Sequence, residues 1–538
     1  MQNTHFDTVV AGGGIAGLVT ALELLKAGRT VCIVDRDTPE KIGGLARWAF
    51  GGMALCNTPH QKKMKIPDNP KTLLKDWHSF AEFEDGDNWP KLWAEEYAEK
   101  NHEKVFLWLE ALGLKFLPAV NWVERGLYKP GNSLPRYHVL WGTGWELVEV
   151  VIKHLTPFLN NNTLSILHQH KVLNPTFDEG QISGAKVMDE QTQTTFELTS
   201  NNVVIACGGI NGSAEQVRKN WYKPWGEPPE EFLNGANPIS DGALHEAVVE
   251  SGGKLTREQH MWNYAAGIKH PQAEFEGHGL SLIPCKSALW LDHTGKRIGD
   301  MPLITGFDTN YLCKVVAKQE KPWTWQLLNW RIAAKELAVS GSLHNPSIRD
   351  KKLFKFLKEI LLGNHRLVKQ LERESDDFIT ADTLEELVSK MNAETGENFV
   401  KLNTIEQVVE EFDSNFSNKD KLYNDDQIRR ILHARQWKPD SLRTCKPKPL
   451  SDKSGGKFIA IKTQLITRKS LGGIQTNLSS QVLNSEGETI EGLYCVGEAA
   501  GFGGGGANGK RSLEGTFLSG CILTARNAAE SILNQIAK

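Results

Sequence analysis

The stretch FDTVVAGGGIAGLVTALELLKAGRTVCIVDRD, residues 6–37, decides the fold of this chain. It begins with a short β-branched run, continues through Gly12-x-Gly14-x-x-Gly17, and passes into apolar residues at helical spacing. A second β-branched run starts at Thr30 and ends on Asp35. Strand, tight turn, helix and strand in this order predict a βαβ unit that binds a dinucleotide.

The three glycines have separate physical tasks in such a unit. Gly12 permits the turn, Gly14 lets the backbone approach a pyrophosphate, and Gly17 lets the helix pack closely on the strand. The first N–H groups of the helix have no partner within it, so we expect them to face phosphate. Asp35 can accept hydrogen bonds from ribose hydroxyls. The unit alone leaves open whether the dinucleotide is FAD or NAD.

Length and composition limit the remaining possibilities. A chain of 538 residues exceeds what one hydrophobic core usually serves, so we expect two or three domains. A formal charge of −3 provides no basic field for nucleic acid. The eight cysteines include no CxxC pair, which argues against a metal site or a disulfide framework and favours a reducing compartment. With no signal sequence and no apolar run of roughly 18 residues, we expect a cytoplasmic protein without a transmembrane segment.

A second glycine-rich stretch, GLYCVGEAAGFGGGGANGKRSLEGTF, occupies residues 492–517. Taken alone, GFGGGGANG would pass for a flexible linker. It lies, however, between an apolar strand that ends at Gly497-Glu498 and the start of a helix. This position favours a second segment of the same ligand site.

Several blocks of the chain resemble the FAD-dependent fumarate reductase and 3-ketosteroid dehydrogenase superfamily, and most closely its bacterial FAD-binding dehydrogenases. The blocks are GGLARWAFGGM at 43–53, NVVIACGGI at 202–210, SDGALHEAVVESGGKL at 240–255 and the C-terminal stretch 492–517. The resemblance implies an α/β protein with a Rossmann-type, glutathione-reductase-like FAD-binding domain and an inserted α+β capping domain. It also implies noncovalent FAD, because the loop 43–53 has no histidine to carry the flavin.

The resemblance further implies where the domains and the cofactor contacts lie. The first part of the FAD-binding domain would span 1–264, with a Trp-rich insertion at about 77–145, the capping domain 265–455, and the second part of the FAD-binding domain 456–538. The backbone at Val172 would meet the adenine, Glu498 the ribityl chain, and the amides that follow Glu514 the flavin ring. The implied FAD-binding residues are Gly12, Gly14, Ile15, Ala16, Gly17, Asp35, Arg36, Gly43, Gly44, Leu45, Ala46, Gly51, Gly52, Val172, Ala206, Cys207, Gly208, Asp241, Lys469, Gly497, Glu498, Gly515, Thr516 and Phe517.

The substrate residues depart from the pattern of the fumarate-reducing members, which bind a dicarboxylate with two histidines and two arginines. Tyr264 stands at the position of the first histidine. The motif HHTMGG of those members is replaced here by RKSLGG, which begins at Arg468. The window 303–308, where the proton-delivering arginine would lie, contains none, and Ser512 replaces the arginine near the end of the motif.

The ketosteroid-type relatives instead place tyrosines and backbone N–H groups around an apolar slot. Tyr264, Tyr311, Arg468 and Gly515 are therefore the catalytic candidates. Tyrosine has an ordinary pKa of about 10, so it needs a nearby cation such as Arg468 or Lys469 to act as a base.

The resemblance implies an FAD-dependent oxidoreductase that transfers a hydride between flavin and a CH–CH bond next to a carbonyl. The expected substrate is a small apolar ketone or enone of the ketosteroid type, and the flavin exchanges electrons with an external acceptor such as a quinone, a redox protein or oxygen. No metal is expected. Two alternatives remain: an enoate or fumarate-type reductase, and a flavin-binding electron-transfer subunit.

Overall fold

A computed structural model describes residues 4–126, 129–299, 308–417 and 423–536. The chain folds into two compact units. The first comprises residues 1–222, 236–262 and 468–538, and the second comprises residues 223–235 and 263–467. The assignment of FAD binding and capping to particular ranges, with boundaries after 264 and 455, stays a prediction.

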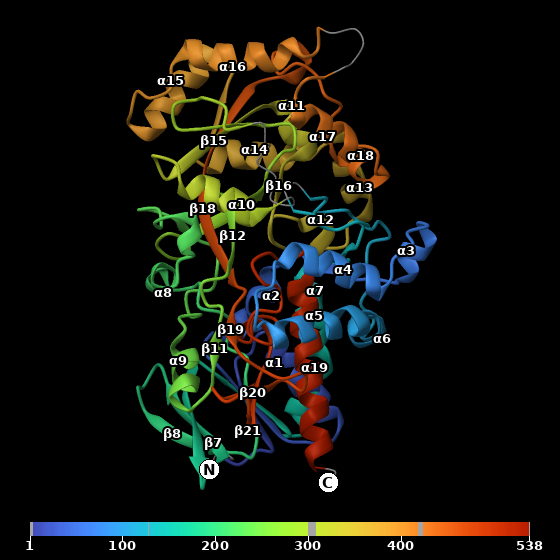
Figure 1. Cartoon of the computed structure of the whole chain (residues 1–538), viewed down its shortest axis with the longest axis vertical. Helices are drawn as coiled ribbons and strands as arrows, with labels where there is room; N and C mark the ends of the chain where they lie inside the picture. The colour runs from blue at the N-terminus through green and yellow to red at the C-terminus, as the bar shows by residue number, and fades with distance from the viewer. Residues whose placement is uncertain (1–3, 127–128, 300–307, 418–422, 537–538) are drawn as a thin grey trace. The chain divides into compact units, whose positions relative to one another are not determined.

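The first unit is built on a six-stranded sheet in the order β20-β21-β9-β1-β2-β5 (Figure 1). These strands are β1 (Thr8–Ala11), β2 (Val31–Asp35), β5 (Leu164–His168), β9 (Val203–Ile205), β20 (Gln481–Leu483) and β21 (Thr489–Cys495). All neighbours are parallel except β20 and β21. Because the carboxyl ends of parallel strands lie at one edge, the segments after β1, β2, β9 and β21 meet there.

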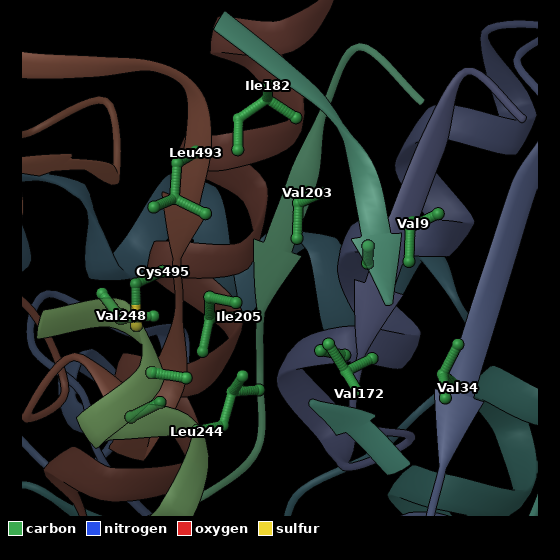
Figure 2. Packing of buried hydrophobic residues seen from close by; sticks show 14 of the residues in the cluster. Val9, Val34, Val172, Ile182, Val203, Ile205, Leu244, Val248, Leu493 and Cys495 are labelled. Carbon is green, nitrogen blue, oxygen red and sulfur yellow. The ribbon is translucent and has the colours of Figure 1, made fainter. Parts of the chain in front are cut away.

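The core of the first unit lies between this sheet and a second layer. That layer is an antiparallel sheet of β6 (His170–Asp178), β7 (Gln181–Asp189) and β8 (Thr195–Thr199), together with α9 (Ala243–Glu250). Figure 2 shows Val9, Val203 and Ile205 of the large sheet in one cluster with Ile182 of β7 and Leu244 of α9. Alternate residues of a strand point to opposite faces, which leaves the other face for helices. There α1 (Ile15–Lys26) packs against α7 (Thr143–Asn160) and α19 (Thr516–Ile536).

Shorter elements complete the first unit. They are α2 (Leu45–Trp48), β3 (Gly52–Ala54), α3 (Pro59–Lys63), α4 (Pro70–Ala81), α5 (Asn88–Lys100), a π-helix (Asn101–Leu107), α6 (Trp108–Ala111), β4 (Tyr137–Val139), α8 (Ala214–Lys219), β11 (Leu255–Thr256) and β19 (Gly473–Ile474).

The glycine-rich loop 501–509 is packed against the Trp-rich segment and is not a linker. All nine of its residues are buried. A Cβ atom at Gly503 or Gly504 would come within 3 Å of the Trp93 ring. The indole N–H of Trp77 donates to the carbonyl oxygen of Ala507 at 2.9 Å. The loop needs glycine here because the indole leaves no room for side chains.

We expect Trp77→Phe to lower the free energy of unfolding by about 1–2 kcal/mol, because the buried carbonyl of Ala507 would lose its donor. Urea denaturation followed by circular dichroism measures the change. Trp145→Phe is the matched control, since Trp145 stacks on Arg47 through its ring and its indole N–H has no partner among the described residues. Equal effects of the two changes would contradict the anchoring role of Trp77.

The second unit is a mostly antiparallel sheet covered by helices. The strand order is β14 (Leu289–Leu291), β15 (Trp323–Asn329), β18 (Phe458–Ser470), β12 (Met261–Lys269), β13 (Gly279–Ile283) and β16 (Ala338–Val339), and β10 (Leu233–Asn234) and β17 (Phe378–Ala381) also pair with β18. Strand β10 pairs with β18 in parallel. Its helices are α10 (Thr309–Ala317), α11 (Trp330–Glu336), α12 (Pro346–Arg349), α13 (Leu353–Leu362), α14 (His365–Glu374), α15 (Leu384–Thr395), α16 (Leu402–Ser414), α17 (Asp426–Ala434) and α18 (Lys438–Arg443). Among the described residues, no helix has the length and apolar character needed to cross a bilayer.

Candidate active site

The glycine turn after β1 presents an open helix N-terminus. Gly14 is the N-cap of α1, no side chain caps the helix, and a Cβ at Gly14 would meet no atom within 4 Å. By contrast, a Cβ at Gly17 would lie 2.0 Å from the carbonyl oxygen of Gly12. The backbone is therefore accessible at Gly14 and tightly packed one turn later, as the motif predicts for a phosphate site at Ile15 and Ala16.

The loop 43–53 lies beside this turn. The N–H of Gly43 donates to the carbonyl of Gly13 at 2.8 Å, and Gly14 and Gly43 form a parallel bridge. Gly44 has a φ of +55°, where a side chain would be strained, and it directly precedes α2, which contains Leu45 and Ala46. Gly51 and Gly52 follow α2 and lead into β3. The structure thus brings the second predicted segment to the first.

The C-terminal glycine stretch also lies beside the glycine turn after β1. A Cβ at Gly497 would lie 2.8 Å from the Cβ of Ala16, so the segment after β21 touches the start of α1. The carbonyl of Gly515 accepts a hydrogen bond from the N–H of Ala54 at 2.8 Å, which joins the start of α19 to β3. The two glycine stretches therefore come together at one edge of the large sheet.

Polar residues line the end of β2. Asp35 accepts hydrogen bonds from the N–H groups of Gly13 and Asp37, and burial raises the pKa of its carboxyl. Arg36 forms ion pairs with Asp241 at 2.7 Å and with Glu190 at 2.8 Å. The structure therefore joins two predicted FAD residues, Arg36 and Asp241, in one ion-pair cluster.

The middle of the chain contributes the segment after β9. The N–H of Ala206 donates to Ala11 at 2.9 Å, and a Cβ at Gly12 would lie 2.4 Å from the carbonyl oxygen of Ala206. Cys207 and Gly208 follow, and burial raises the pKa of the Cys207 thiol to about 12, which makes it inert. Val172 lies on β6, with its side chain in the core cluster.

Two half-buried charged groups lie near the C-terminal end of β18: Lys469, which is part of the strand, and Glu498, which follows β21. Glu498 accepts a hydrogen bond from the N–H of Ser470 at 3.0 Å. Burial raises the pKa of Glu498, and burial together with the charge of Arg468 lowers the pKa of Lys469. The ammonium of Lys469 lies 4.2 Å from the ring centroid of Phe517, which with Thr516 begins α19.

The four catalytic candidates are divided between the units. Arg468 and Gly515 belong to the first unit, and Gly515 precedes α19 with a φ of +96°. Tyr264 lies buried on β12 and Tyr311 is half-buried on α10, both in the second unit. The thiol of Cys313 on α10 donates to the carbonyl of Asn263, so the elements that carry the two tyrosines are neighbours. Of the window 303–308, only Asp308 belongs to the described residues.

The sequence interpretation missed three residues that hold this site together. Gly13 bonds both Gly43 and Asp35, and it stands in the same glycine run as its predicted neighbours. The hydroxyl of Ser470 accepts from the N–H of Ile210 at 3.0 Å. Glu124 accepts from the N–H of Glu514 at 2.8 Å and from Asn132 at 2.8 Å. Nothing in the sequence near Glu124 indicates this contact.

We expect the stability of the protein to depend on pH through the buried carboxyl of Glu124. Burial, with the nearby charge of Glu514, raises its pKa to about 8. When the pKa of a carboxyl is higher in the folded than in the unfolded protein, the folded protein keeps its proton over a wider pH range. The free energy of unfolding is then highest below the unfolded pKa, and it falls as the pH rises towards the folded pKa. We expect the free energy of unfolding to fall by about 1–2 kcal/mol more in the parent protein than in Glu124→Gln between pH 6 and pH 8. Parallel urea titrations measure both slopes, and identical slopes would contradict the assignment.

These residues fit FAD. An uncapped helix N-terminus with open space at Gly14 suits a pyrophosphate, and the start of α19 with Lys469 suits a ring that gains negative charge on reduction. The FAD-binding domain family matches residues 7–518. The chain belongs to this family.

Individual relatives extend this finding over nearly the whole chain. A KsdD-like steroid dehydrogenase of Mycobacterium tuberculosis H37Rv is 36% identical over 98% of this chain and 96% of its own. One from Mycolicibacterium smegmatis is 36% identical over 95% and 96%. Among solved structures, 3-ketosteroid delta1-dehydrogenase from Sterolibacterium denitrificans, in complex with 1,4-androstadiene-3,17-dione, matches with a TM-score of 0.69 at 15% identity, over 99% of this chain and 100% of the other.

Family membership and this structural likeness confirm the predicted superfamily, the α/β flavoprotein fold and FAD as the cofactor. The individual FAD-binding and catalytic residues stay predictions.

Proposed function

We propose that the protein is an FAD-dependent dehydrogenase that oxidises a CH–CH bond next to a carbonyl in an apolar, ketosteroid-like substrate. The observation that carries this proposal is the 36% identity to KsdD-like steroid dehydrogenases over 98% of the chain. The catalytic candidates of this sequence agree with it, because Tyr264 stands where a dicarboxylate-binding enzyme has a histidine, and Ser512 stands where it has an arginine.

The residues of the site receive the following roles. Ile15 and Ala16 would donate N–H groups to the pyrophosphate, Asp35 would meet the ribose, and Glu498 would bond the ribityl chain. Bound FAD supplies a two-electron acceptor for the hydride. The half-buried position of Lys469 beside Phe517 would provide positive charge close to the flavin, where partial exclusion of water strengthens electrostatic interactions.

The substrate residues act on the carbonyl and on the adjacent proton. A backbone N–H at Gly515 would polarise the ketone oxygen and so acidify the α-carbon. Tyr264 would accept the α-proton, a step that a nearby cation would favour by stabilising the phenolate. Tyr311 would contact the ketone end of the substrate.

The test is anaerobic reduction of the bound flavin. Saturated 3-ketosteroids are mixed with the holoenzyme while the absorbance of oxidised flavin is followed, and succinate serves as the dicarboxylate comparison. We expect bleaching within seconds by a ketosteroid and none by succinate. Failure of every ketosteroid to bleach a flavin that dithionite reduces would reject the proposal, and bleaching by succinate would favour a fumarate-type reductase.

The remaining assignments belong to the same proposal. We assign FAD binding to the first unit and substrate capping to the second. The reduced flavin would pass its electrons to an external acceptor, a quinone, a redox protein or oxygen. A cytoplasmic location is supported by the eight cysteines, all of which are free thiols in the described structure.

A further inference from the structure

Helix α13 of the second unit turns large apolar side chains towards solvent. Every residue of its LFKFLKEILL sequence is at least partly exposed. The exposed fractions are 88% for Phe354, 66% for Leu362, 61% for Leu361, 50% for Leu353 and 43% for Leu357. A surface helix of a globular protein normally buries its apolar face, so this arrangement needs an explanation.

The orientation of α13 is fixed by its buried side. With about 100° between successive residues, Leu353, Phe354, Leu357 and Leu361 fall within one arc of about 100°. The opposite arc contains Glu359, which accepts a hydrogen bond from the hydroxyl of Ser347 and lies 3.8 Å from Arg366. The ammonium of Lys335 also donates to the carbonyl of Ile360 at 2.7 Å, near the end of the helix. These polar contacts hold the apolar arc outward.

Exposed lysines lie beyond one edge of the apolar arc, with Lys358 next to it and Lys355 further round the helix. Residues 351–362 contain four lysines, Lys351, Lys352, Lys355 and Lys358, and a single acid, the inward-facing Glu359. No carboxylate of the described residues lies within ion-pair distance of Lys355 or Lys358. Helix α18 packs against α13 and adds Leu442, which is 40% exposed, next to Arg443 (Figure 1). The two neighbouring helices therefore both carry exposed apolar side chains and basic residues, and α18 also contains Asp440.

We propose that α13 docks on the surface of an anionic phospholipid bilayer. In this arrangement Phe354, Leu357 and Leu361 enter the boundary between headgroups and acyl chains, and Lys355 and Lys358 contact lipid phosphates. A ten-residue helix is about 15 Å long, half the thickness of the hydrocarbon core, so it lies in the interface and does not span it.

The charges favour a lipid surface over a second copy of this chain. A two-fold contact through α13 would bring Lys355 and Lys358 of both copies into one interface. Like charges at close range oppose such a contact, whereas lipid phosphates neutralise them. The apolar arc alone would suit either occupant, and the lysines distinguish the two.

The test is co-sedimentation of the full-length holoenzyme with vesicles. One set of vesicles contains phosphatidylcholine alone. The other contains phosphatidylcholine with about 30% of the anionic lipid phosphatidylglycerol. Phe354→Ser/Leu361→Ser removes the apolar arc, and Lys355→Glu/Lys358→Glu reverses the charge. Lys153→Glu/Leu159→Ser on α7 is the matched control, because both residues are exposed on a helix of the first unit. Flavin absorbance and the melting temperature confirm that each variant is folded.

We expect the parent protein and the α7 control to bind the anionic vesicles at least about tenfold more strongly than the neutral ones. Both α13 variants should lose at least about fivefold of that binding, and added salt should weaken it. Equal binding to both vesicles, no binding to either, or α13 variants that bind like the parent would overturn the proposal. A dimer that Phe354→Ser/Leu361→Ser dissociates, without vesicle binding, would assign the surface to self-association. These results do not depend on the substrate, so they stand apart from the flavin-bleaching test.

Discussion

Gly14→Val leaves a folded protein that no longer holds FAD. We expect its affinity for FAD to fall at least about 100-fold, equal to about 2.8 kcal/mol. Gly14 has a φ of −69° and a ψ of 173°, which valine adopts readily, and a Cβ there would meet no protein atom within 4 Å. The valine methyl groups would instead fill the space that the pyrophosphate needs beside the first N–H groups of α1.

The measurement is FAD titration of the apoprotein, with the melting temperature of the apoprotein as the test of folding. Ala27→Val is the matched control at the other end of α1, where the side chain is exposed. Gly17→Val gives the contrasting result, because its Cβ would lie 2.0 Å from the Gly12 carbonyl oxygen, and it should lose the fold itself. Normal FAD affinity in Gly14→Val would exclude the turn as the pyrophosphate site.

Tyr264→Phe removes the proposed proton acceptor and leaves the flavin in place. We expect the rate of flavin reduction by a saturated ketosteroid to fall by about 10²- to 10³-fold, within the range that general-base catalysis contributes. The ring of Tyr264 is buried, so phenylalanine keeps its packing while the hydroxyl is lost. FAD content and substrate affinity should change little by comparison.

Single-turnover stopped-flow measurements under anaerobic conditions separate this chemical step from reoxidation by the acceptor. Tyr423→Phe is the control, because Tyr423 lies in the same unit and contacts Phe416 through its ring. A pH profile adds a second readout, since a titrating phenol gives a rate that rises with pH and Tyr264→Phe should flatten it. An unchanged reduction rate in Tyr264→Phe would remove its acid–base role and move the assignment to Tyr311.

Much of the fold could be read from local patterns. The β-branched runs and helical spacing around Gly12 and Gly17 predict β1, α1 and β2, which the structure confirms with their glycine packing. The strand before Gly497 and the helix after Gly515 follow from the same kind of signal. These features depend on interactions between residues close in the chain, so their residue pattern alone carries the information.

The sequence by itself determined the βαβ unit and the FAD-binding family, and it predicted that Tyr264 replaces a dicarboxylate-binding histidine. Only the tertiary structure decided that Gly497 touches Ala16, that Glu124 bonds the start of α19, and that Trp77 and Trp93 pack on the glycine loop. It also decided that the apolar arc of α13 faces outward, where helical spacing alone would predict burial. Such contacts join residues far apart in the sequence. They depend on strand order and on how helices fill the remaining surface, which no local pattern specifies.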